Sequence, residues 1–268
     1  MMKKLGLFTL LFAFLYACEK SDLSEVSPDV LPVVAAYLEA GQTPVVQITR
    51  QLAYGILDSS DLNILDLAVY IESEGVEHLL TQNTEGAYVA DSIWKPAAGK
   101  TYRLHFTYNN LEVSASTTVP EAPVNFKASA SSIEVPSFDI GGGGTPPDFP
   151  DPIDLTWDNT IGEYYQVAVV NTESDPELIN DMGDDDRPRP RFSNSPEQNN
   201  SYELGFQSFS YYGNHRVILY RVNAEYVSLT QSTSDNSQNL SAPYTNVTNG
   251  LGIFTGVGAD TLNIKVTK

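Results

Sequence analysis

The amino-acid sequence predicts an all-β protein built from two tandem β-sandwich domains. Short apolar runs with alternating polar residues recur between glycine, proline and asparagine turns, which is typical of strands. The chain has 268 residues, of which 41% are hydrophobic, including 15 tyrosines and 11 phenylalanines. That length suits two domains of about 100 to 150 residues each, and the apolar content can fill two cores.

Residues 1–17 are predicted to be a signal peptide. Lys3 and Lys4 precede an apolar run that is shorter than the roughly 20 residues needed to span a bilayer. The run ends at Cys18, the only cysteine of the chain. The alternatives are a chance cysteine behind a cleaved signal or a short membrane helix. The polar residues that follow at once argue against a helix in the membrane.

The segment Leu15-Tyr16-Ala17-Cys18 resembles the lipobox of bacterial lipoproteins. The resemblance implies cleavage before Cys18 and attachment of fatty-acyl groups such as palmitate to that residue. Each buried methylene adds about 0.8 kcal/mol to membrane anchoring. Residues 18–30 would then be the lipidated cysteine and a polar tether. We therefore expect a lipid anchor in the outer membrane, on either its periplasmic or its cell-surface face.

The charge balance argues against nucleic acid as a partner. The formal net charge is −19, and loss of Lys3 and Lys4 with the leader makes the mature chain more negative. Such a field repels phosphate backbones and anionic lipid headgroups. With Cys18 used as the anchor, no disulfide and no thiolate metal site are expected, and no cofactor is predicted.

The first domain is expected at residues 31–120. Its best-determined feature is a hairpin about Asn109-Asn110, because asparagine tolerates the positive φ of a two-residue turn. This turn pairs Tyr108 with Leu111 and places His105 on the polar face opposite Ser114. The expected strands are Val33–Leu38, Val45–Gln51, Ile64–Ile71, Ala87–Val89, Tyr102–Tyr108 and Leu111–Val119. Gly86-Ala87-Tyr88 and Gly99-Lys100-Thr101-Tyr102 resemble the pattern of transthyretin-like and carboxypeptidase-regulatory-like sandwiches. The resemblance implies a transthyretin-like or immunoglobulin-like sandwich for this domain.

The second domain is expected at residues 121–268, with a short helix from Ala224 to about Thr233 capped by Asn223. Trp157, one strand ahead of Tyr165, resembles the core pair of fibronectin type III sandwiches, so we expect Trp157 in the core. The expected strands are Val124–Val135, Ile153–Trp157, Tyr164–Val170, Tyr202–Tyr211, Arg216–Val222, Leu251–Gly256 and Thr261–Val266. Tyr202–Tyr211 and Arg216–Val222 are expected to form a hairpin about Gly213-Asn214.

Three long connections, residues 136–151, 172–201 and 223–250, are expected at one pole of the second domain. Strictly antiparallel strands would alternate them with tight turns, and long loops that meet at one end favour a binding surface. Three unstructured insertions are the alternative. The candidate binding residues are Phe149, Arg187, Arg189, Arg191, Tyr211, Tyr212 and Tyr244. The candidate calcium ligands are Asp184, Asp185 and Asp186, for which a solvated charge run is the alternative.

No catalytic residues are predicted. His78, His105 and His215 have no partner motif, and no HExxH, GxSxG or phosphate-loop pattern is present. We read His105 as a solvated strand residue and His215 as a residue beside a turn. A hydrolase with carboxylates in the long loops is the enzymatic alternative.

Trp157-Asp158-Asn159, Tyr164-Tyr165 and Asn249-Gly250-Leu251-Gly252-Ile253-Phe254 are similar to a lipoprotein family of unknown function in Bacteroidota. Its members are commonly encoded beside TonB-dependent outer-membrane receptors. The resemblance implies a non-catalytic accessory role in an uptake system, with such a receptor as partner. A surface glycan-binding protein or adhesin is the alternative, with Phe149, Tyr211, Tyr212 or Tyr244 as stacking platforms.

Overall fold

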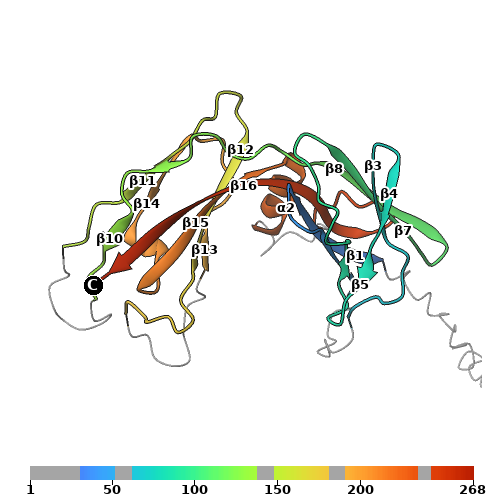
Figure 1. Ribbon diagram of the computed structural model, residues 1–268, viewed down its shortest axis with the longest axis horizontal. Helices are drawn as coiled ribbons and strands as arrows, with labels where there is room; N and C mark the ends of the chain where they lie inside the picture. Colours follow the sequence, from blue (N-terminus) through green and yellow to red (C-terminus); the bar gives the residue numbers. More distant parts are fainter. Residues whose placement is uncertain (1–30, 52–61, 138–147, 181–190, 235–242) are drawn as a thin grey trace, which may run out of the picture. The chain divides into compact units, whose positions relative to one another are not determined.

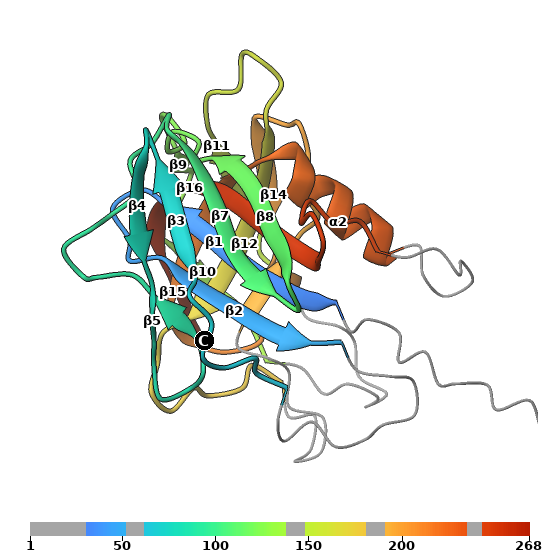
Figure 2. The same ribbon diagram turned by 90° about the vertical axis from the view of Figure 1, so that its right-hand side faces the viewer.

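The computed structural model describes residues 31–51, 62–137, 148–180, 191–234 and 243–268, and these residues are mostly in strands (Figures 1 and 2). The expectation of an all-β fold with one α-helix is confirmed for the described residues. The strands of the N-terminal part are β1 (Pro32–Glu39), β2 (Val45–Arg50), β3 (Tyr70–Ser73), β4 (Val76–Leu79), β5 (Thr81–Gln82), β6 (Tyr88–Val89), β7 (Thr101–Tyr108) and β8 (Leu111–Thr118). The later elements are β9 (Lys127–Ala128), β10 (Ser132–Glu134), β11 (Ile153–Thr156), β12 (Tyr164–Asn171), β13 (Arg191–Ser193), β14 (Ser201–Leu204), the 3₁₀ turn η2 (Phe206–Ser208), β15 (Gly213–Val222), α2 (Ala224–Ser234) and β16 (Leu251–Thr267).

Three sheets organise these strands. The largest has the order β13-β12-β15-β16-β1-β2-β6-β5, and β10 also pairs with β16. A second sheet has the order β4-β3-β7-β8, which Figure 2 shows side by side, and a third has the order β14-β11-β9. Residues 124–135, expected as one strand, contain β9 and β10 in two different sheets, because the chain crosses between the sheets there.

The hairpin of β7 and β8 has the predicted register. Tyr108 lies opposite Leu111 and His105 lies opposite Ser114. Asn109 and Asn110 have φ values of 50° and 63°, the left-handed conformation that a tight hairpin turn requires. The inward side chains of this ladder are buried and the outward ones are polar, so a one-residue slip would expose the core.

Two large hydrophobic cores fill the described part of the molecule, and a smaller cluster contains Val222, Val227 and Val257. In the first, the inward residues of β1 and β2 pack against those of β3, β7 and β8, and Trp94 packs at its margin. In the second, β12, β15 and the end of β16 pack against β11 and β14. Trp157 is buried in this second core, with its ring 5.5 Å from that of Tyr165 and 6.4 Å from that of Phe126. The prediction that Trp157 is a core residue is confirmed.

The last strand belongs to both cores, which differs from our expectation. Leu251–Gly256 was expected to close the sheet of the second domain, but it pairs in parallel with β1. Phe254 is fully buried in the first core, whereas Ile264 is buried in the second. Figure 1 shows β16 as one continuous arrow along its 17 residues. The boundary between residues 120 and 121 stays a prediction.

Glycines allow the backbone of residues 118–121 to lie directly against β16. A Cβ atom at Gly256 would overlap the carbonyl oxygen of Thr118, and one at Gly258 would overlap that of Glu121. Gly252 has φ +89° and lies against the Val34 backbone of β1. The glycine-rich run around Phe254 is therefore required by close backbone contact.

The three long connections do not meet at one pole. Val222, where residues 223–250 begin, lies opposite Tyr164, whereas Asn171, where residues 172–201 begin, lies opposite His215 at the other end of the ladder. The expectation failed because Tyr202–Tyr211 is not one strand of a hairpin. That segment contains β14, which pairs with β11, and the turn η2.

We predict that Gly258→Ala destabilises the protein by about 1–3 kcal/mol, because the added methyl group meets backbone atoms that cannot rotate away. Urea unfolding followed by circular dichroism measures the change. Gly205→Ala is the matched control, since Gly205 has φ −76° and an added Cβ meets only the Gln207 side chain. Equal stability of the two variants would contradict the prediction.

Candidate functional site

A pocket of about 420 Å³ lies on the face of the largest sheet next to α2. We name it the tyrosine pocket, because three tyrosines line it together with polar and aliphatic side chains. Its lining residues are Tyr37, Glu39, Gln42, Gln166, Arg191, Tyr220, Val222, Tyr226 and Val257.

The ladder of the sheet fixes most of these side chains in position. Glu39 on β1 and Val222 on β15 both lie opposite Val257 on β16, so the three form a row across neighbouring strands. Tyr220 on β15 lies opposite Gln166 on β12 in the same way. Val222 and Val257 are buried and supply an apolar floor, while the polar groups stand around it. This combination is typical of a ligand pocket.

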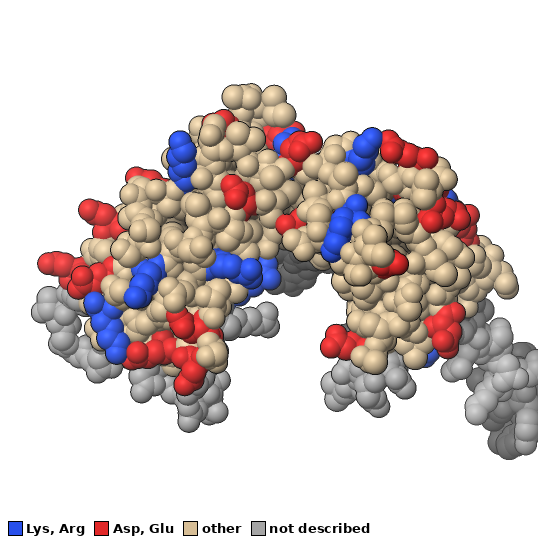
Figure 3. Space-filling view, viewed as in Figure 1, with Lys and Arg blue, Asp and Glu red and all other residues tan. Residues whose placement is uncertain are grey.

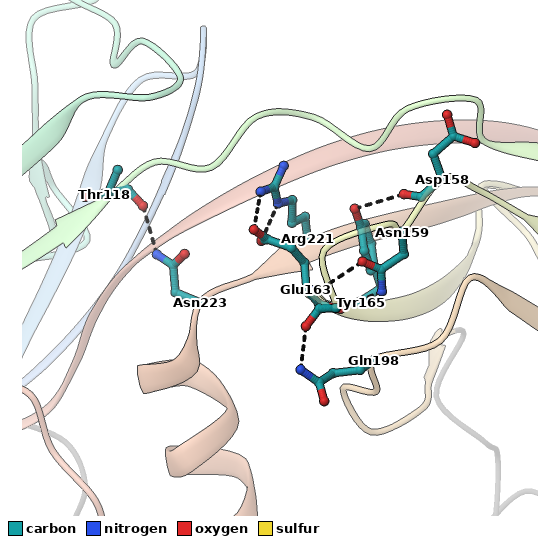
Figure 4. Close-up of polar contacts among 9 residues, drawn as sticks. Thr118, Asp158, Asn159, Glu163, Tyr165, Gln198, Arg221 and Asn223 are labelled. Carbon is teal, nitrogen blue, oxygen red and sulfur yellow. Dashed lines mark hydrogen bonds and ion pairs between the residues drawn. The ribbon is translucent and has the colours of Figure 1, made fainter.

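The helix α2 supplies Tyr226, and a polar cluster fixes the start of this helix (Figure 4). The Asn223 side-chain amide donates hydrogen bonds to the Thr118 carbonyl at 2.8 Å and to the Thr117 hydroxyl at 3.0 Å. Glu225 in the first turn accepts from the hydroxyls of Thr117 at 2.7 Å and Thr255 at 3.0 Å. The predicted helix is confirmed, and the Asn223 amide donates to Glu225 of its own helix at 3.2 Å as well as to β8.

Two contacts position the aromatic rings at the pocket. The Tyr226 hydroxyl donates to Gln166 Oε1 at 3.0 Å, and the Tyr226 ring stands edge-on to Tyr37 at 6.1 Å. Tyr37 lies on the outward face of β1 and is 48% exposed. Its ring is therefore held at one edge and open to solvent elsewhere.

Burial opposes ionisation of Glu39, Tyr37 and Tyr220 in the tyrosine pocket. It raises the pKa of the Glu39 carboxyl above its ordinary value. Burial also raises the pKa of the Tyr37 hydroxyl and that of Tyr220, although the nearby charge of Arg191 partly offsets the shift at Tyr220. Carboxyl groups whose surroundings disfavour the charged form are common in binding and catalytic sites.

A bidentate ion pair between Arg221 and Glu163 holds β15, the strand that carries Tyr220 and Val222 (Figure 4). Arg221 Nε donates to Glu163 at 2.6 Å, and a second guanidinium nitrogen lies 2.6 Å from the other carboxylate oxygen. This hydrogen bonding raises the pKa of the Arg221 guanidinium. Asn159 closes the turn by accepting from the Glu163 backbone N–H at 2.9 Å. Tyr220 and Val222, the neighbours of Arg221, are thereby held in place.

The structure brings one predicted binding residue, Arg191, into the tyrosine pocket. Tyr211 and Tyr212 are 6% and 8% exposed, so their rings are not open faces for stacking. Tyr244 is 37% exposed, and Phe149 stacks on Phe206 at 4.0 Å. Cys18, Arg187, Arg189, Asp184, Asp185 and Asp186 lie outside the described residues.

Sequence reasoning missed Tyr37, Glu39 and Tyr220. One signal was available at Tyr37: β1 alternates buried and exposed positions, and the tyrosine occupies an exposed position next to the core residues Ala36 and Leu38. A large aromatic ring on the solvent-exposed face of a regular strand indicates a contact outside the hydrophobic core, such as one with a ligand or another element. Tyr220 gave no such signal, because it follows the apolar run Val217–Leu219, in which buried and exposed positions do not alternate.

The histidines differ from their expected surroundings. His105 has a side chain only 16% exposed and stacks on Tyr70 at 5.3 Å, so it is not a fully solvated residue. His215 lies within β15 and is 3% exposed. It contacts Gly213 O through Nδ1 at 3.1 Å and Asn171 through Nε2 at 3.2 Å, and burial lowers its pKa. His78 stacks on Trp94 at 4.1 Å.

The visible surface carries both signs of charge. In Figure 3, basic side chains are interspersed with acidic ones over the face shown. Within the described ranges, no helix combines the length and apolar character needed to cross a bilayer.

Residues 21–263 match the model of a protein family described as a domain of unknown function, DUF4249. The match covers most of the chain, and the protein belongs to this family. Comparison with functionally curated proteins gives no match. The matched range begins three residues after Cys18 and includes every lining residue of the tyrosine pocket.

Proposed function

We propose that the protein is a lipid-anchored accessory protein of the outer membrane that acts as a non-catalytic binding or assembly module of a TonB-dependent uptake system. The observation that carries the proposal is Cys18. The only cysteine of the chain closes a short apolar leader and directly precedes the family domain at residue 21. A Bacteroidota-type lipoprotein has this order of leader, lipidated cysteine and folded domain.

The tyrosine pocket supports a binding role for the folded part. It presents the side chains of Tyr37, Tyr220, Arg191 and Glu39 over an apolar floor. These groups can hold a small polar ligand by hydrogen bonds and ring contacts. The ligand would then be passed to a receptor in the same membrane.

A non-catalytic role fits the chemistry of the pocket lining. Among the described residues that line it, Glu39 is the one carboxyl group, and no histidine, serine or cysteine is present. General acid–base catalysis needs a proton acceptor oriented by a second group. Binding requires only the hydrogen-bonding groups and the apolar floor that the lining supplies.

We predict that Cys18→Ala abolishes incorporation of radiolabelled palmitate and releases the protein from the outer-membrane fraction, because the thiol would carry the acyl anchor. Labelled cells are fractionated, and the protein is followed by immunoblotting. Lys4→Ala is the control, since it keeps the cysteine and leaves one basic residue in the leader.

Unchanged labelling of the Cys18→Ala variant would contradict the lipid anchor. The uptake role is tested separately by crosslinking intact cells that carry the wild-type chain. A TonB-dependent receptor should be recovered with the protein from the outer membrane, and its absence from the crosslinked material would contradict the partnership.

A surface glycan-binding protein is the second candidate function. The observation that favours it is the exposed Tyr37 ring, which stands beside hydroxyl, amide, guanidinium and carboxylate groups. Sugars present apolar ring faces edged with hydroxyls, and this lining matches both features.

We predict for this candidate that Tyr37→Ala and Tyr220→Ala each weaken binding to a glycan array by about tenfold, because each removes a ring and a hydroxyl from the tyrosine pocket. Ile161→Ala is the control, since Ile161 is an exposed apolar residue that does not line this pocket. An array without hits, or hits unaffected by both pocket variants, would contradict glycan binding.

A further inference from the structure

Three potential metal ligands converge on the sheet of β3, β4, β7 and β8, on the face opposite the first core. Glu72 on β3 lies directly opposite Glu77 on β4. His105 on β7 lies opposite Tyr70, two residues before Glu72 on the same face of β3. One ligand atom from each of Glu72, Glu77 and His105 lies within 4.8 Å of the other two.

The two glutamates form a pair that is unfavourable without a cation. Like charges directly opposite each other on neighbouring strands destabilise a sheet. Within the described part of the chain, the lysine or arginine that contacts this group is Arg103, 3.8 Å from Glu72, which also forms a short ion pair with Glu112 on β8. Glu72 and Glu112 therefore share one guanidinium, while the charge partner of Glu77 is His105, and the excess negative charge favours a divalent cation.

His105 is arranged as a ligand more than as a hydrogen-bond donor. Its Nε2 atom lies 3.1 Å from Glu77 Oε1, but it is buried and makes no hydrogen bond of acceptable geometry. The ring stacks on Tyr70 with an interplanar angle of 13°, which fixes its direction. An imidazole nitrogen that is buried, has no hydrogen bond and lies near two carboxylates can act as a metal ligand.

We propose that Glu72, Glu77 and His105 form a binding site for a divalent transition-metal cation such as Zn²⁺. One imidazole and two carboxylates match the ligand preferences of Zn²⁺, whereas Ca²⁺ takes six to eight oxygen ligands. Zinc–ligand bonds of about 2.0–2.2 Å require the three atoms to approach one another further. The side chains of Glu72 and Glu77 are 33% and 55% exposed, so they are free to rotate inward. Water would complete the coordination.

This site is independent of the proposed function, because it uses neither Cys18 nor the tyrosine pocket. Arg103 competes with the cation for Glu72, while Glu112 retains the guanidinium when the metal is bound. We therefore expect that removing the positive charge of Arg103 strengthens zinc binding.

The test is isothermal titration of zinc chloride into the full chain purified in detergent at pH 7.5, with magnesium and calcium chloride as separate titrants. We expect one high-affinity zinc ion per chain and no comparable binding of the other two ions. His105→Gln and Glu77→Gln should each weaken zinc binding by about tenfold or more. Arg103→Gln should tighten it, since one competing charge is lost.

Glu74→Gln and His78→Gln are the matched controls. Glu74 belongs to the same hairpin but pairs with Lys100, and His78 stacks on Trp94, so both variants should bind zinc as the wild type does. Circular dichroism of each zinc-free variant checks folding. If a ligand variant does not fold, the wild-type protein is titrated with zinc instead and its histidine NMR signals are followed. The His105 signal is assigned by elimination, once the His78 variant has identified the His78 signal and the signal of buried His215 has been set aside. We expect the His105 signal to shift. No zinc binding, binding unchanged in folded His105→Gln and Glu77→Gln, or an unmoved His105 signal would overturn the proposal.

Discussion

Backbone pairing along Leu251–Thr267 constrains the rest of the structure. The beginning of this strand pairs in parallel with β1, and its later part pairs with β15 in the antiparallel direction. A strand buried in two cores cannot change register in one core without disturbing the other. Gly256 and Gly258 let the chain between β8 and β9 lie against it, so no side chain separates the two backbones. The tyrosine pocket depends on this continuity, because its lining residues come from strands on both sides of β16.

The parts of the fold that local chemistry determines were predictable. The register of β7 and β8 follows from Asn109-Asn110 and the alternation on either side. The burial of Trp157 follows from its resemblance to the core tryptophan of fibronectin type III sandwiches. The pairing of β1 with β16 was not predictable in this way, because it joins residues more than 200 positions apart in parallel. Strand alternation shows which face is buried but does not name the partner strand. The same limit produced the false hairpin at Tyr202–Tyr211.

The candidate site was predictable only at Arg191. Pocket residues such as Glu39 and Tyr220 become neighbours through the order of strands in the sheet, and that order depends on β16. The cluster of Glu72, Glu77 and His105 was hidden for a related reason. Pairing β7 with β8 correctly placed His105 on the outward face, but pairing with β3 and β4 on the other side brings the carboxylates to it. Both sites arise from lateral strand neighbours that sequence periodicity does not specify.

The central claim is that β16 joins the two cores into one cooperative unit. The chain has two tryptophans, Trp94 at the first core and Trp157 in the second, so Trp157→Phe and Trp94→Phe each leave a fluorescent reporter in one core. In each variant, urea unfolding is followed by tryptophan fluorescence and by far-ultraviolet circular dichroism. The account predicts that the two signals have the same midpoint in both variants. A fluorescence midpoint that departs from the circular dichroism midpoint in either variant would contradict it.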